Sequence, residues 1–135
     1  MGVHRLNVLI LNEDPNLINK ISCTLQDQGF DMKWATTYAE AKKLMKSDRF
    51  DVLITDITMP EDDGIKLSKS VCGQIPIVLL TAGSGGEVLA RKFEDICDCF
   101  LDKGDIVSRL GQATWKAFKR FKIDREIVRD LKLAA

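Results

Sequence analysis

Residues 51–64, with the sequence DVLITDITMPEDDG, contain the stretch that decides the fold. Residues 52–54 are apolar without polar alternation, which is typical of a strand covered on both faces in a parallel sheet flanked by helices. Pro60 and Gly64 then interrupt the extended chain. Asp56 therefore falls where such a strand ends, and in open α/β sheets the carboxyl ends of the strands form the ligand crevice. Asp56 is a candidate functional residue, although an aspartate at this place is also commonly a helix cap or a turn residue.

Three further apolar runs also end in side chains that suit phosphate or metal chemistry. They are VLIL at 8–11 before Asn12 and Glu13, IPIVLL at 75–80 before Thr81, and CFLD at 99–102 before Lys103. Four strand ends thus offer acids, a hydroxyl and an amine, which is chemistry that could serve a phosphorylated carboxylate. Taken singly, a threonine at a strand end is usually a cap, and a lysine after a strand is usually solvated.

In this order and spacing, the chain resembles the receiver domain of bacterial two-component response regulators over residues 7–121. The intervals from Glu13 to Asp56 and from Thr81 to Lys103 are close to those usual in that family. The interval from Asp56 to Thr81 is a few positions shorter, which indicates a trimmed third helix or following loop. The resemblance implies a flavodoxin-like (βα)5 fold, a doubly wound five-stranded parallel sheet with strand order 2-1-3-4-5.

The composition fits one globular domain of 135 residues, of which 45% are hydrophobic. Twenty basic residues balance twenty acidic ones, so the charge gives no reason to expect nucleic acid or an acidic membrane, and the expected partner is a protein. Four cysteines without C-x-x-C spacing and one histidine support neither a zinc site nor a disulfide framework. No signal-like or membrane-spanning apolar run appears, which predicts a cytoplasmic protein.

The pattern of apolar residues predicts five strands alternating with five helices. A second strand around residues 30–34 is expected at the sheet edge, and Thr37 with Glu40 forms a capping-box pattern. We expect residues 83–86, GSGG, to be a free loop. The fourth helix is then marked by Leu89, Phe93 and Ile96. The fifth is marked by a stripe of apolar residues and capped by Asp105; the stripe is Leu110, Ala113, Ala117 and Phe121. Residues 1–121 form the predicted receiver, and 122–135 a helical extension or connector.

By resemblance, Asp56 is the phosphoacceptor, and Lys103 and Thr81 contact the phosphoryl oxygens. The implied cofactor is Mg²⁺, which suits oxygen ligands. Its predicted ligands are carboxylate oxygens of Glu13 and Asp56, the backbone carbonyl of Thr58, and Asn12 through a water molecule. The implied switch is a movement of Thr81 coupled to the aromatic residue Phe100, which packs against the fourth helix.

Two positions depart from the family pattern. Asn12 stands where most receivers have a second acid, so we expect weaker Mg²⁺ binding, unless Asp14 compensates. Gly104 stands where the family usually has a proline in a cis peptide bond, and here we expect a trans bond.

The predicted function is a receiver that accepts a phosphoryl group on Asp56 from a histidine kinase or phosphotransfer protein. The domain is not an enzyme beyond its own phosphoryl transfer and autodephosphorylation. It would signal through its fourth and fifth helices to a second copy or to an output domain. The alternative is a pseudo-receiver, a protein-binding module that works without phosphorylation. A flavodoxin-like enzyme or cofactor carrier is a third class, but the acids after the first strand repel the phosphate that it would bind.

Overall fold

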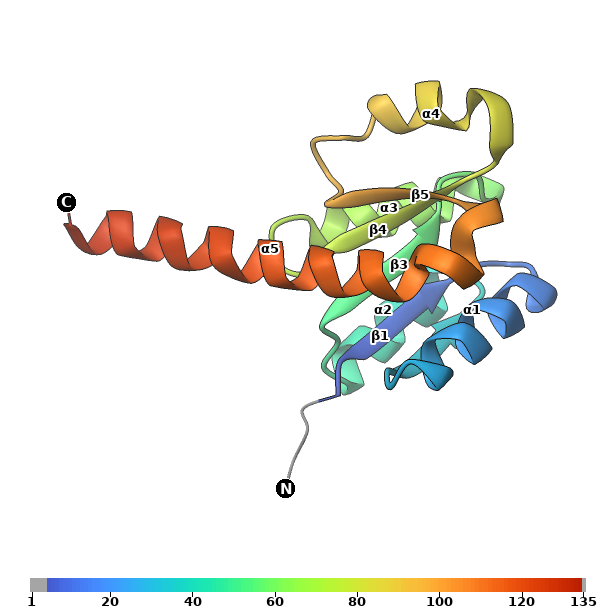
Figure 1. Cartoon of the computed structure of the whole chain (residues 1–135), viewed down its shortest axis with the longest axis horizontal. Helices are drawn as coiled ribbons and strands as arrows, with labels where there is room; N and C mark the ends of the chain where they lie inside the picture. The colour runs from blue at the N-terminus through green and yellow to red at the C-terminus, as the bar shows by residue number, and fades with distance from the viewer. Residues whose placement is uncertain (1–4, 135) are drawn as a thin grey trace.

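The computed structural model describes residues 5–134, without the side-chain surroundings of residues 84, 85 and 87. Five strands pair in parallel to form one sheet (Figure 1). They are β1 (Asn7–Leu11), β2 (Asp31–Ala35), β3 (Val52–Asp56), β4 (Ile77–Thr81) and β5 (Cys99–Asp102). Their order across the sheet is β2-β1-β3-β4-β5. The predicted flavodoxin-like topology is confirmed, including the edge position of the second strand.

Five helices cover the two faces of the sheet. They are α1 (Pro15–Asp27), α2 (Tyr38–Ser47), α3 (Asp63–Val71), α4 (Gly83–Arg91) and α5 (Ile106–Ala134). Short 3-10 turns, Pro60–Asp62 and Lys103–Asp105, precede α3 and α5. The helices α1 and α5 lie on one face, and α2, α3 and α4 lie on the other (Figure 1). Within residues 5–134, no helix combines the length and the apolar character that crossing a bilayer requires.

The core has two halves because successive side chains of a strand point to opposite faces. Val8 and Ile10 of β1 join the cluster under α1 and α5, whereas Leu9 and Leu11 join the cluster under α2, α3 and α4. Every residue of β3 and β4 is buried. The two central strands are therefore apolar along nearly their whole length, and their polar side chains are confined to the carboxyl ends.

Local capping fixes the beginnings of the first two helices. The Asp14 carboxylate accepts the backbone N–H of Asn16 at 2.9 Å, and Pro15 occupies the first turn of α1. The Thr37 hydroxyl accepts the N–H of Glu40 at 3.2 Å, as predicted for the start of α2. These contacts define where the chain turns at the ends of β1 and β2.

Three expectations about local structure were wrong. Residues 83–86 are the first turn of α4 and not a free loop, because packing against β4 outweighs the low helix propensity of glycine. The helix ends at Arg91, so Phe93 and Ile96 lie in the turns that follow. Before α5, it is the Asp102 carboxylate that accepts a backbone N–H, from Gly104 at 2.7 Å, since the chain first makes a 3-10 turn there.

The loop between β3 and α3 brings the helix very close to the strand end. Glu61 and Asp62 adopt left-handed backbone conformations with φ of 58° and 56°. A Cβ atom on Gly64 would lie 2.2 Å from the backbone oxygen of Asp56 and 2.7 Å from the Thr55 hydroxyl oxygen. Gly64 therefore permits a contact that no other residue could make, and it braces the end of β3.

We expect Gly64→Ala to destabilise the protein by about 2–3 kcal/mol, because the added methyl group must push α3 away from the backbone of β3. Chemical denaturation measures the loss. Lys66→Ala, at an exposed position of the same helix, is the control and should stay within about 0.5 kcal/mol of the parent. Equal stability of Gly64→Ala and the parent would contradict the close approach.

Candidate functional site

The register of β1 and β3 brings Asn12 and Asp56 together. Leu11 pairs with Thr55, so the next residues along the two parallel strands, Asn12 and Asp56, are neighbours at the carboxyl edge of the sheet. Both are buried, with 2% and 4% of their surface exposed. A buried carboxylate requires compensating partners, since removing a charge from water is costly.

The Asp56 carboxylate has three such partners. Its Oδ2 forms an ion pair with the Lys103 ammonium and accepts a hydrogen bond from Asn12 Nδ2 at 3.4 Å. Its Oδ1 accepts the backbone N–H of Thr58 at 3.0 Å. The side chain of Lys103 is 30% exposed and that of Asp56 is 6% exposed, so the lysine reaches from the rim into the site.

Lys103 reaches Asp56 across the end of β4, which lies between β3 and β5 in the sheet. The turn that carries it is held by the hydrogen bond from Gly104 to Asp102. No peptide bond within residues 5–134 is cis, so the bond between Lys103 and Gly104 is trans as predicted. The ion pair shows that Lys103 meets Asp56 without a proline at position 104.

Thr81 ends β4, beside the ion pair, and is 7% exposed. A Cβ atom on Gly86 would lie 2.9 Å from Thr81 Cβ and 3.3 Å from its hydroxyl oxygen. The first turn of α4 therefore presses directly on Thr81. Among the described residues, no hydrogen bond joins the Thr81 hydroxyl to the Asp56 carboxylate. Sequence analysis missed this role of Gly86, although the helix-forming residues that follow it could have indicated that the helix begins earlier.

A buried carboxylate, a lysine and a threonine at the ends of adjacent parallel strands form one composite site. The family model of the response regulator receiver domain matches residues 8–113. The chain belongs to this family. The family is one of signalling domains and not of classical enzymes.

Curated relatives agree with the family match. The chain is 31% identical to the swarming motility regulation protein RssB of Serratia marcescens over 101 residues, which cover 73% of this chain and 46% of that protein. It is 27% identical to the heme response regulator HssR of Staphylococcus aureus over 118 residues, covering 86% and 53%. The chain thus spans about half the length of the curated relatives it matches.

Solved structures share the fold. The receiver domain of the Francisella response regulator 1452 has 26% identity and a TM-score of 0.73, with 86% of this chain and 98% of that one covered. NtrX from Brucella abortus has 20% identity and a TM-score of 0.81, with coverage of 95% and 30%. The second likeness concerns the fold alone.

In this receiver, the residues predicted to hold Mg²⁺ form a sparse donor set. Glu13 is exposed in the loop after β1, and Asp14 caps α1, where its carboxylate is already used. The Asn12 side-chain oxygen accepts the backbone N–H of Asp14 at 2.9 Å. Within the described part of the chain, no three His, Cys, Asp or Glu residues are grouped to hold a metal ion. Of the predicted ligands, Glu13 and Asp56 are the only carboxylates, and an ion held by so few protein oxygens would keep several waters.

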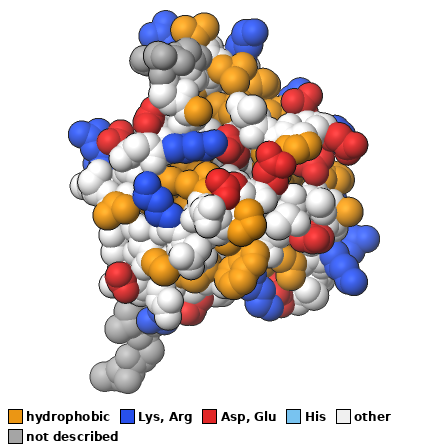
Figure 2. Space-filling model, turned by 90° about the vertical axis from the view of Figure 1, so that its right-hand side faces the viewer, with side chains coloured by type: hydrophobic (Ala, Val, Ile, Leu, Met, Phe, Trp, Pro, Cys, Tyr) orange, Lys and Arg blue, Asp and Glu red, His pale blue; other side chains and the backbone are white. Residues whose placement is uncertain are grey.

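Figure 2 views the receiver from the right-hand side of Figure 1, the side where the strands end. Acidic side chains spread over the centre and upper right of this face, among apolar and neutral ones. The two residues predicted to form the switch share a groove. Thr81 and Phe100 line a groove of about 470 Å³ between α4 and β5, together with Arg91 and Asp102. A movement of Thr81 would therefore change the shape of this groove.

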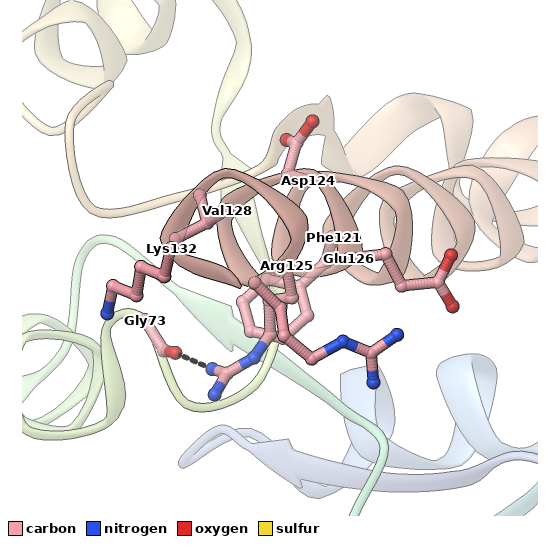
Figure 3. A pocket seen from close by; sticks show the side chains of 8 residues that line it. Gly73, Phe121, Asp124, Arg125, Glu126, Val128 and Lys132 are labelled. Carbon is pink, nitrogen blue, oxygen red and sulfur yellow. Dashed lines mark hydrogen bonds between the residues drawn. The ribbon is translucent and has the colours of Figure 1, made fainter. Parts of the chain in front are cut away.

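The fifth helix continues well beyond the part that matches the family model. It runs unbroken from Ile106 to Ala134 and projects past the sheet (Figure 1). Arg125 donates a hydrogen bond to the backbone oxygen of Gly73, and its guanidinium lies 5.4 Å from the centre of the Phe121 ring (Figure 3). The predicted division between residues 121 and 122 falls inside this continuous helix and stays a prediction.

We expect Gly86→Ala to move Thr81, because the added methyl group would lie too close to its side chain. The clash outweighs the gain in helix propensity of about 1 kcal/mol, which leaves a net loss of about 1 kcal/mol in stability. The NMR resonances of the Thr81 backbone and methyl group report the displacement. Val88→Ala, at a position of α4 that is 69% exposed, should leave those resonances in place. Unchanged Thr81 resonances in both variants would contradict the contact.

Proposed function

We propose that this receiver accepts a phosphoryl group on Asp56 from a histidine kinase or phosphotransfer protein and thereby changes a protein-binding surface. The observation that carries the proposal is the buried Asp56 carboxylate paired with Lys103, next to the hydroxyl-bearing Thr81. A nucleophile, a fixed positive charge and a hydroxyl donor are the groups that phosphoryl transfer requires around an acceptor.

In the transfer step, a carboxylate oxygen of Asp56 forms a bond to phosphorus while the bond between phosphorus and the donor imidazole nitrogen breaks. The imidazole leaves with the electron pair of that bond. Lys103 offsets the negative charge that the phosphoryl oxygens bring to Asp56, and the Thr58 N–H is already aimed at this carboxylate. Bound Mg²⁺, held by Glu13, Asp56 and the backbone carbonyl of Thr58, would supply further positive charge.

The proposed output passes through α4 and β5. A phosphoryl group on Asp56 offers an acceptor to the Thr81 hydroxyl, which draws Thr81 away from Gly86. Phe100 is half-buried beside the same groove and can turn into the space that Thr81 leaves. Phe100 has no hydroxyl group, so the switch works by packing and not by a side-chain hydrogen bond.

A pseudo-receiver is the second candidate, and one observation favours it. The position that faces Asp56 from β1 holds an amide and not an acid, so every described partner of the Asp56 carboxylate is a hydrogen-bond donor. Such a site is stable without phosphorylation. In that case the fold would serve as a binding module whose surface does not respond to phosphate.

The protein is proposed to be cytoplasmic, where a histidine kinase or phosphotransfer protein could reach it. The four cysteines, Cys23, Cys72, Cys97 and Cys99, are all free, as is usual in a reducing compartment.

Two of these cysteines are chemically quiet. Burial raises the pKa of the Cys97 thiol to about 12 and also raises the pKa of the Cys99 thiol. These two thiols are therefore poor nucleophiles.

We expect one phosphoryl adduct on Asp56 after incubation with acetyl phosphate and Mg²⁺, detected by intact-protein mass spectrometry. Asp56→Asn should abolish the adduct, since the amide is a poor nucleophile. Asp62→Asn is the matched control, because it is the same substitution at an exposed site of the same loop. If neither acetyl phosphate nor beryllofluoride modifies the parent at saturating Mg²⁺, the pseudo-receiver function replaces this one.

The outer half of α5 is proposed to be the connector to a second copy of the chain or to an output domain. Its apolar side chains are half or more exposed: Ile123 56%, Ile127 52%, Val128 50% and Leu131 66%. Val128 and Leu131 continue the helix face that packs on the sheet through Leu110, Ala113 and Ala117, whereas Ile123 and Ile127 lie to one side of that face. An apolar face that leaves the domain in this way is typical of a surface that pairs with another helix.

We expect sedimentation equilibrium to show self-association that becomes stronger with beryllofluoride. Replacing Ile127 and Leu131 by serine should reduce it by about tenfold or more, since each buried aliphatic side chain contributes about 1.5–3 kcal/mol. The control replaces Glu126 and Asp130, exposed on the same helix, by serine. A monomer under both conditions, also after deletion of residues 122–135, would leave the output-domain connector as the remaining role.

A further inference from the structure

The side chain of Asn12 is held at both ends. Its Oδ1 accepts the backbone N–H of Asp14 at 2.9 Å, and its Nδ2 donates to Asp56 Oδ2 at 3.4 Å. The residue is only 2% exposed. Asn12 is therefore part of the buried surroundings of Asp56.

The contact with Asp14 decides which end of the amide faces Asp56. A backbone N–H can be accepted only by the oxygen of the Asn12 side chain, so the NH2 group must point the other way. That group then meets a carboxylate oxygen, which needs donors. The two contacts support each other, and reversing the amide would leave a donor facing the N–H of Asp14 and an acceptor facing Asp56.

An aspartate at position 12 would reverse the electrostatics of this contact. The same turn would still hold one oxygen at the Asp14 N–H, but the other would face Asp56 Oδ2 and repel it. Two carboxylates a few ångströms apart in a buried place repel each other until a cation lies between them or one of them takes up a proton. With asparagine, the N–H bond supplies part of the positive charge that a cation would otherwise bring.

We propose that Asn12 is a positioning residue, which holds the Asp56 carboxylate through its side-chain NH2 group and so orients the acceptor before any cation binds. This inference deepens the proposed phosphoryl-acceptor function and rests on it for its biological meaning. Together with Lys103 and the Thr58 N–H, Asn12 completes a set of three donors around Asp56. The consequence is a receiver whose resting site is complete without metal and binds Mg²⁺ weakly.

The remaining acids near the site do not restore the lost charge. The Asp14 carboxylate accepts the N–H of Asn16 as the cap of α1, and Glu13 is exposed. A charge added at an exposed position in the first turn of α1 should therefore affect the cation much less than a charge placed at Asn12, because solvent screens it. This difference separates a specific role of Asn12 from a general effect of added charge.

The test measures Mg²⁺ affinity by titration calorimetry in the parent, in Asn12→Asp and in the control Asn16→Asp. Asn16 is exposed in the first turn of α1, four positions after Asn12, and both variants add one negative charge. We expect Asn12→Asp to bind Mg²⁺ about tenfold tighter than the parent, as two close charges at an intermediate dielectric would produce, and Asn16→Asp to stay within about twofold. Equal affinities of the parent and Asn12→Asp, or equal tightening by both variants, would overturn the proposal.

Thermal unfolding in EDTA gives a second readout that needs no phosphorylation. Asn12→Asp should unfold at a lower temperature than the parent in EDTA and recover in saturating Mg²⁺, because the cation relieves the repulsion.

A third variant removes the proposed donor. Asn12→Ser keeps an acceptor for the Asp14 N–H but has no NH2 group for Asp56. It should form less beryllofluoride adduct than the parent at low Mg²⁺ and regain it at high Mg²⁺, whereas equal adduct at every Mg²⁺ concentration would overturn the proposal.

The outcomes also separate this proposal from the proposed function. If no variant forms an adduct on Asp56 under any condition, phosphoryl acceptance is contradicted. The Mg²⁺ affinities and the unfolding temperatures in EDTA then still decide whether Asn12 orients Asp56 in place of a cation.

Discussion

The site depends on one interaction, the ion pair between the buried Asp56 carboxylate and Lys103. It joins the end of β3 to the turn after β5, across the end of the intervening β4. A carboxylate this buried needs a positive partner, and a lysine needs a carboxylate to be drawn in from the rim. The other contacts of Asp56, from the Thr58 N–H and Asn12, satisfy the oxygens that the lysine leaves partly open. The strand ends are thereby tied into one unit.

Two glycines determine how closely the helices approach this unit. Gly64 lets α3 touch the backbone of Asp56, and Gly86 lets the first turn of α4 touch the side chain of Thr81. Both contacts are short enough that a single methyl group would disturb them. Because well-packed interfaces shift between discrete arrangements and do not deform smoothly, a small movement of Thr81 would be passed on to α4 and the groove beside Phe100.

The fifth helix packs on the sheet with its first part and carries the proposed connector surface on its outer part. Its first part packs on the sheet through Leu110, Ala113 and Ala117, and its outer part presents an exposed apolar face. The contact from Arg125 to the Gly73 carbonyl ties the beginning of this outer part to the turn before β4. A change at the site could reach the projecting helix through β3, β4 and β5, which α5 contacts. The matched region covers about half the length of these curated relatives.

The sequence by itself determined the parallel sheet and, through the family resemblance, the strand order. It also identified Asp56, Thr81 and Lys103, because an apolar run and the polar residue that follows it are neighbours in the sequence. It also placed Asn12 where an acid is expected. Only the tertiary structure decided how Asn12 acts, since the direction of its amide depends on the Asp14 N–H. The glycines of residues 83–86 were misread as a loop for the same reason. Among them, Gly86 packs against Thr81, a contact between segments that local propensity does not record.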